Sequence, residues 1–125
     1  MRKAFHLEFA VEAERDFGLI FDHLLRSYIE FGESLEGALD HAESRIAEIR
    51  ATAGRVITAP HRGERHDDIL PGLRHLAIGR AIYWFDVDDQ QQTVRVLAVF
   101  FGGQDHVRHM IARLLEDSAE SGWSP

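Results

Sequence analysis

Cysteine is absent from the sequence, and lysine occurs only once, as Lys3. Without thiols the chain forms no disulfides, offers no thiolate ligands to zinc and has no cysteine nucleophile. The sequence also lacks any apolar run near the roughly 20 residues of a membrane-spanning helix. Its short N-terminal apolar stretch is interrupted by Glu8 and does not read as a signal sequence. We therefore expect a soluble, cytoplasmic protein with no membrane association.

Positively charged residues are also fewer than negatively charged ones, 14 against 21. The formal net charge of −7 creates a field that repels phosphate groups. Binding to nucleic acid depends on cations that neutralise phosphates, so this balance disfavours direct binding of DNA or RNA. Residues 12–50 contain ten acidic residues and four arginines, whereas residues 55–80 contain five arginines and three acidic residues. The second half of the chain therefore carries the local basic surface.

The first half of the chain predicts a short strand followed by two antiparallel helices. Residues 4–9 suit a strand with one buried face. Apolar residues recur at helical spacing over residues 11–31, and Gly32 ends that helix. Ser34 is a suitable N-cap for a second helix, which keeps the same apolar spacing until Gly54. Most acidic residues fall on the outer face of this hairpin, as is typical of a solvent-exposed helix surface.

The second half predicts a small antiparallel sheet and a final helix. Residues 55–72 are rich in Arg, His, Gly, Pro and Asp without a clear period, which indicates a long loop. Turn residues then separate three apolar strands that should pair as a meander, over 73–78, 81–87 and 93–101. A helix with one apolar stripe follows Gly102-Gly103, and residues 116–125 read as a loose tail. The predicted order is β-α-α-β-β-β-α, a single α+β domain with an N-terminal helical hairpin packed on a small antiparallel sheet.

Four short motifs occur in order within residues 71–106: Gly72-Leu73-Arg74 at a strand start, Gly79-Arg80 before an aromatic strand, Val87-Asp88-Asp89 in a hairpin, and Val96-Leu97 before the segment that opens the last helix. In this order and spacing they resemble the carboxyl-terminal half of ParE-type toxins of the RelE/ParE superfamily. Ala13, Asp16 and Ile20 also resemble the helical hairpin of that family. The resemblance extends over about residues 5–115.

This resemblance implies a RelE/ParE-like fold and the role of toxin in a type II toxin–antitoxin system. Such toxins are held inactive by a cognate antitoxin whose disordered segment folds across them, so a ParD-like antitoxin is the implied partner. ParE-type members are generally associated with poisoning DNA gyrase, whereas RelE cuts messenger RNA on the ribosome. Fold alone does not decide between these activities. A degenerate member without activity is a third alternative.

Arginines of the predicted sheet are the main candidates for a site. Arg74, Arg80 and Arg95 lie on or beside predicted strands, and the bidentate pairing of arginine with carboxylates suits an acidic antitoxin segment. We expect these three residues and Trp84 to contact the antitoxin or the target, with no catalytic residue. In the alternative RNA-cleaving site, Arg80 clamps phosphate, Arg74 gives electrostatic support and His106 is the general acid or base. The single lysine argues against that alternative.

Histidines raise the question of a metal site. Two groups occur, one in the predicted loop and one on the predicted last helix: His61, His66, Asp67 and Asp68, and His106 with His109. Neither group matches a recognised ligand motif. We therefore expect no metal and no cofactor, and we interpret the protein as a binding toxin rather than an enzyme.

Overall fold

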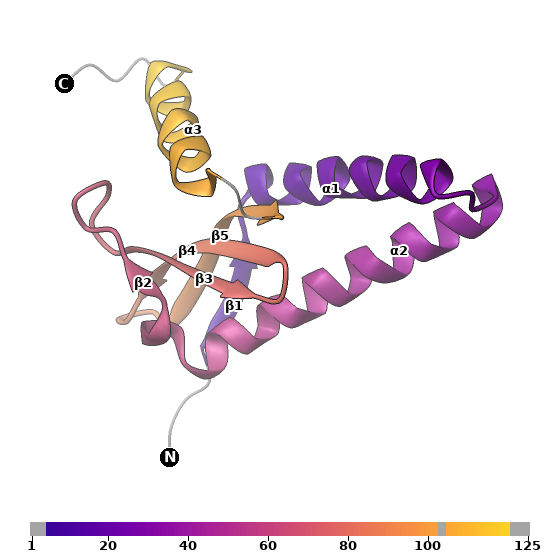
Figure 1. Ribbon diagram of the computed structural model, residues 1–125. Helices are drawn as coiled ribbons and strands as arrows, with labels where there is room; N and C mark the ends of the chain where they lie inside the picture. The colour runs from indigo at the N-terminus through magenta and orange to yellow at the C-terminus, as the bar shows by residue number, and fades with distance from the viewer. Residues whose placement is uncertain (1–4, 103–104, 121–125) are drawn as a thin grey trace.

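The first half of the chain forms a strand and a helical hairpin in the computed structural model, which describes residues 5–102 and 105–120 (Figure 1). The elements are strand β1 (His6–Phe9), helix α1 (Val11–Glu30) and helix α2 (Leu35–Thr52). Gly32, in the turn between the helices, has a φ of 100°, a conformation that glycine adopts without strain. The Ser34 hydroxyl oxygen accepts a hydrogen bond from the Gly37 amide at 3.1 Å, as an N-cap does. The predicted hairpin is confirmed.

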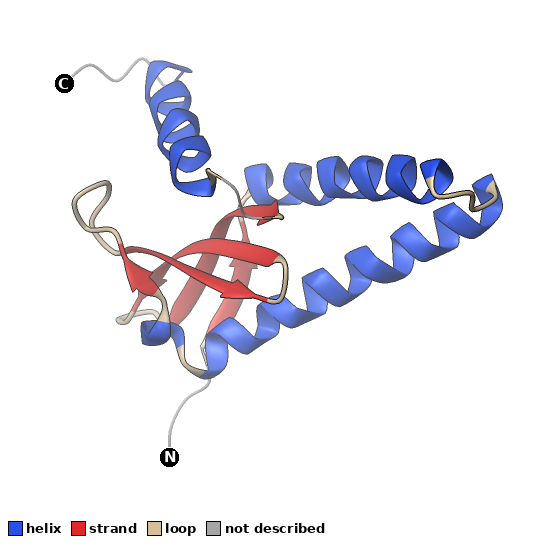
Figure 2. Ribbon diagram, viewed as in Figure 1, coloured by secondary structure: helices blue, strands red, loops and turns tan. Residues whose placement is uncertain are grey.

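Five strands form one sheet in the order β1-β5-β4-β3-β2. The other strands and the last helix are β2 (Glu64–Arg65), β3 (Leu73–Ile78), β4 (Ala81–Asp88), β5 (Thr93–Phe101) and α3 (His106–Glu120). Strands β3, β4 and β5 pair as the predicted antiparallel meander, and β1 adds to β5 in parallel orientation. Figure 2 shows the strands gathered into one sheet, in red, from which the helical hairpin extends as a long arm. The predicted α+β class is confirmed.

The segment expected to be a long loop, residues 55–72, contains regular structure, and this corrects the predicted element order. It holds most of the 3₁₀ helix η1 (Ala53–Thr58), the 3₁₀ helix η2 (Pro60–Arg62) and strand β2, which pairs antiparallel with β3. Both residues of β2 are exposed. Because the strand is so short and has no buried face, it lacks the alternation of apolar residues by which strands are predicted.

Both faces of the sheet are covered, which gives two apolar cores. The larger core lies between the sheet and the helical hairpin and includes Phe17, Tyr83 and Phe85. The smaller core lies beneath α3 and includes Trp84 and Met110. Because neighbouring side chains of a strand point to opposite faces, β4 contributes to both cores. This explains why five consecutive residues at the start of β4 are all buried.

Helix α3 is tied to the rest of the molecule by one buried carboxylate. Asp16 of α1 is 3% exposed, and its two oxygens accept hydrogen bonds from the Arg113 guanidinium of α3 at 2.7 and 2.8 Å. One of these oxygens also accepts the Val99 amide of β5 at 2.9 Å. The Asp16 carboxylate therefore links a helix from each end of the chain to strand β5.

Helix α3 continues to Glu120 and so enters the segment predicted as a loose tail, of which residues 121–125 lie outside the described part of the chain. Among the described helices, none combines the length and apolar character needed to cross a bilayer.

Candidate functional site

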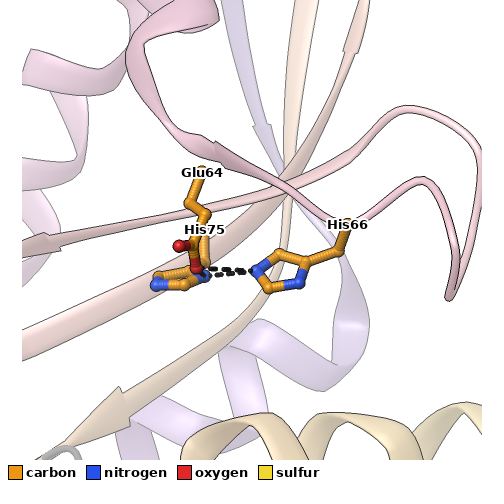
Figure 3. A group of neighbouring side chains, drawn as sticks. All are labelled: Glu64, His66 and His75. Carbon is orange, nitrogen blue, oxygen red and sulfur yellow. Dashed lines mark hydrogen bonds and ion pairs between the residues drawn. The ribbon is translucent and has the colours of Figure 1, made fainter.

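Three side chains converge at the β2–β3 edge of the sheet (Figure 3). The Nε2 atom of His66 lies 2.7 Å from the Nδ1 atom of His75. The Glu64 carboxylate lies 3.3 Å from the same atom of His66 and 3.5 Å from the same atom of His75. The side chains of His66 and His75 are 13% and 15% exposed, whereas that of Glu64 is 68% exposed. The two imidazoles are therefore largely withdrawn from water, and the carboxylate borders it.

Strand pairing brings these residues together. Glu64 stands directly opposite His75 in the antiparallel register of β2 and β3. Side chains two residues apart on an extended chain point to the same face, so His66 joins Glu64 there. The close approach of β2 depends on Gly63, where a Cβ atom would lie 2.8 Å from Cζ of Phe85 and 2.9 Å from the His75 carbonyl oxygen.

The loop after β2 is closed by Asp67. Its two carboxylate oxygens accept hydrogen bonds from the Gly72 amide and from Nε of Arg65, both at 2.9 Å. The Gly72 amide and then Arg65 lower the pKa of the Asp67 carboxyl, because both bonds favour its charged form. The His66 amide donates to the Leu73 carbonyl oxygen at 2.8 Å. The loop thereby returns the chain to β3 and keeps His66 beside that strand.

The two imidazoles pack on the ring of Trp84, with ring centroids 4.7 and 4.9 Å apart. Nε1 of Trp84 donates to Nδ1 of His106 at 3.1 Å, and the His106 ring packs edge-on against His75 at 4.7 Å. Burial lowers the pKa of His75 and of His106, the neighbouring imidazoles lower it further, and Glu64 opposes the shift. Both rings are therefore favoured as neutral imidazoles, which accept a proton or bind a cation.

Each residue of the alternative RNA-cleaving site has different partners. Nη1 of Arg74 donates to the carbonyl oxygens of His61 and Gly63, at 3.0 and 3.2 Å. The Arg80 guanidinium lies 5.0 Å from the centroid of the Phe101 ring. His106 accepts a hydrogen bond from Nε1 of the buried Trp84. The structure places His106 beside His75 and Trp84 and does not bring it together with Arg74 and Arg80.

Arg80 lies instead in a basic groove, a depression of about 450 Å³ between α2 and the β3–β4 turn. The charged side chains that line it are Arg45, Arg55, Arg80 and Glu48. Nη1 of Arg45 is 2.7 Å from the Glu48 carboxylate, and the Arg45 guanidinium also lies over Phe101, at 5.7 Å. We refer to the depression lined by Arg45, Glu48, Arg55 and Arg80 as the basic groove.

The other two predicted contact residues lie elsewhere. Arg95 is exposed in a separate depression of about 510 Å³, whose lining is acidic through Glu8, Asp86, Asp88 and Asp89. Burial raises the pKa of Asp86, and the nearby Arg95 opposes that shift. Trp84 has no exposed surface, so a contact with a partner would require α3 to move away. The four predicted binding residues therefore do not form one surface.

Sequence reasoning missed the combination of Glu64, His66 and His75. It grouped His66 with its neighbours along the chain, whereas the structure pairs it with a residue of the next strand. The available signal was the spacing of Glu64 and His66, since residues two apart share a face once the segment is known to be a strand.

No family model matches the chain, and no curated protein matches it. A solved structure does show its fold. A chain of the chromosomal ParDE TA system from P. aeruginosa is 17% identical, with a TM-score of 0.58, over 80% of this chain and 98% of that chain. A chain of the toxin–antitoxin complex RelBE2 from Mycobacterium tuberculosis is 20% identical over 79% of this chain and 99% of that chain, with a TM-score of 0.48. The isolated E. coli RelE toxin is 12% identical over 90% and 99%, also with a TM-score of 0.48. The likeness to the ParDE chain confirms the RelE/ParE-like fold expected from the sequence.

Proposed function

We propose that this chain, with its RelE/ParE-like fold, is the toxin of a type II toxin–antitoxin pair and that a cognate ParD-like antitoxin neutralises it. The observation that carries the proposal is the likeness to a chain of the ParDE system, of which 98% is covered at a TM-score of 0.58. The sequence motifs within residues 71–106 independently resemble the same branch. Because one fold hosts several activities, the fold does not identify the cellular target of the toxin.

The basic groove supports a contact with an acidic antitoxin segment. It presents three guanidinium groups against one carboxylate on a chain whose net charge is −7. Arginine binds carboxylates through two parallel hydrogen bonds, which suits recognition of an extended or helical acidic peptide. The proposal keeps Arg80 from the sequence analysis and adds Arg45 and Arg55, which sequence spacing did not single out.

We propose DNA gyrase as the target, held by binding rather than by chemistry. The resemblance to ParE-type toxins supports this choice. The acidic net charge also favours a protein target over direct capture of nucleic acid. On this proposal the toxin needs no catalytic residue.

Inducible expression in a bacterial host without the neighbouring antitoxin gene tests the proposal. We expect growth arrest with DNA-damage signalling and intact transcripts, relieved when the antitoxin is expressed as well. The purified chain should also inhibit supercoiling by gyrase in vitro. Unimpaired growth in several hosts, with no effect on gyrase, would reject the toxin proposal and favour a degenerate member.

One observation favours RNA cleavage as a second candidate function. His66, His75 and His106 lie around the same tryptophan, with Glu64 at the solvent edge, and such groups are suited to general acid–base catalysis. Growth arrest with cleaved transcripts would support RNA cleavage if His75→Gln abolishes both the arrest and the cleavage. Arrest with intact transcripts would exclude it.

A further inference from the structure

We propose that Glu64, His66 and His75 form a binding site for a divalent transition-metal ion of the zinc class. Their ligand atoms all lie within 4.8 Å of one another and face a common point (Figure 3). The proposal goes beyond the toxin function, because neither the fold likeness nor the basic groove implies a metal. It replaces the sequence-based expectation that the chain binds none.

The distances fit a metal-binding triad. Bonds of about 2.0–2.2 Å around a tetrahedral ion place ligand atoms about 3.3–3.5 Å apart. The separations of Glu64 from His66 and from His75, 3.3 and 3.5 Å, already have this size. The two nitrogens are closer, 2.7 Å, because a shared proton joins them. The ion needs the lone pairs of both nitrogens, so on metal binding the donor ring carries its proton on its other nitrogen and stays a neutral imidazole, and the pair opens by roughly 0.6 Å.

The donor set selects the class of ion. Two imidazoles and one carboxylate are the ligands of catalytic zinc sites, which leave a further position open. Imidazole nitrogen suits zinc and its neighbours in the first transition series, whereas calcium and magnesium prefer oxygen. Because the side chain of Glu64 is 68% exposed, the open position faces water. A bound water molecule therefore completes the coordination.

The surrounding structure holds the ligands in place before an ion arrives. Glu64 and His75 are fixed opposite each other by the register of β2 and β3. Asp67 closes the loop that carries His66, and Arg74 braces the segment that leads into β2. An ion at this point joins β2 to β3 by direct bonds, so it also stabilises the edge of the sheet.

The tryptophan beneath the site offers a direct readout. The sequence has two tryptophans, so Trp123→Phe leaves Trp84 as the single tryptophan, which is excited at wavelengths that tyrosine does not absorb. The full-length chain, without an affinity tag and freed of metal by a chelator, is titrated with Zn²⁺ by calorimetry and with Co²⁺ by visible absorption and fluorescence. We expect binding of one ion per chain, quenching of Trp84 by Co²⁺ and a higher midpoint of thermal unfolding with Zn²⁺.

Variants assign the ion to the triad. Glu64→Gln, His66→Gln and His75→Gln should each weaken Zn²⁺ binding at least tenfold, whereas His23→Gln on the exposed face of α1 should leave it unchanged. Thermal unfolding of the metal-free variants checks that each one folds. The proposal is overturned if the native chain shows no saturable binding of one ion, or if the triad variants bind as tightly as the native chain. Toxicity does not enter these measurements, so their failure leaves the toxin proposal intact.

Discussion

The Arg74 guanidinium donates to two carbonyl oxygens in the segment that leads into β2, and it is partly buried as it does so. Hydrogen bonds from a charged donor contribute about 1.5–3 kcal/mol when buried, and solvent reduces this value at a partly exposed site. We therefore expect Arg74→Ala to lower the free energy of unfolding by about 1–2 kcal/mol. Urea unfolding measures the change. Arg26→Ala, an exposed arginine of α1, is the control and should change stability by less than about 0.5 kcal/mol.

A second prediction at this scale concerns Asp86, whose pKa is raised chiefly by burial. An acid with a raised pKa in the folded state lowers stability once the pH exceeds its pKa in the unfolded chain, and the full penalty is present above the folded-state pKa. Asp86→Asn should therefore raise the unfolding free energy at neutral pH, by a few tenths of a kcal/mol because solvent screens the site.

The gain of Asp86→Asn should vanish at a pH below the usual range of an aspartate pKa, where both proteins are neutral at this position. Unfolding curves of the two proteins at several pH values check this behaviour. A stability difference that does not depend on pH would mean that the substitution acts through packing rather than charge.

At the scale of elements, β2 exists because the chain passes close to β3 at Gly63. A methyl group there would lie 2.8 Å from Cζ of Phe85 and 2.9 Å from the His75 carbonyl oxygen, and a backbone atom has little room to move. We expect Gly63→Ala to cost about 1–3 kcal/mol, as overpacking does, and to pull Glu64 out of register with His75. Gly54→Ala is the control, because nothing lies within 4 Å of a Cβ built there. Hydrogen exchange of the β3 amides should rise in the first variant alone.

The position of α3 depends on the pair between Asp16 and Arg113. Removing one partner of a buried ion pair costs about 3–5 kcal/mol, since the other charge stays buried without compensation. Asp16→Ala also leaves the Val99 amide without its acceptor. We expect a loss of about this size by chemical denaturation and faster proteolysis within α3. Glu48→Ala, which breaks an exposed pair on α2, should cost under about 1 kcal/mol; a similar loss in both variants would contradict the anchoring role of Asp16.

Elements with a repeating apolar pattern were predictable from the sequence, and those held by single contacts were not. The hairpin and the meander follow from apolar residues at helical or alternating spacing, and the Ser34 cap was read directly from residue type. Strand β2 has no buried side chain, so it left no pattern. The candidate site depends on that strand, because pairing of β2 with β3 is what joins Glu64 and His66 to His75. The two backbone partners of Arg74 could not be predicted, because both lie in the segment 55–72, where the sequence shows no periodic pattern.

At the scale of the whole molecule, a chain with a net charge of −7 presents three arginines in one groove. Attraction between a local basic surface and an acidic partner speeds association, and the effect weakens with salt because exposed charges are screened within about 8 Å at physiological ionic strength. If the basic groove receives the antitoxin, reversing its charge should act mainly on the association rate. A surface that steers the partner by charge changes the association rate, whereas a contact that only adds buried area changes mainly the dissociation rate.

The double variant Arg45→Glu/Arg80→Glu tests this role in the full-length chain. We expect the association rate with the cognate antitoxin to fall at least tenfold at low salt, with a weaker salt dependence than in the native protein. Arg15→Glu/Arg26→Glu is the matched control, because it changes the net charge equally at exposed positions of α1 outside the groove. Stopped-flow binding at several salt concentrations measures both variants, and thermal unfolding checks their folding. An equal loss in the two variants would assign the effect to net charge, and the antitoxin contact would then have to lie on another surface.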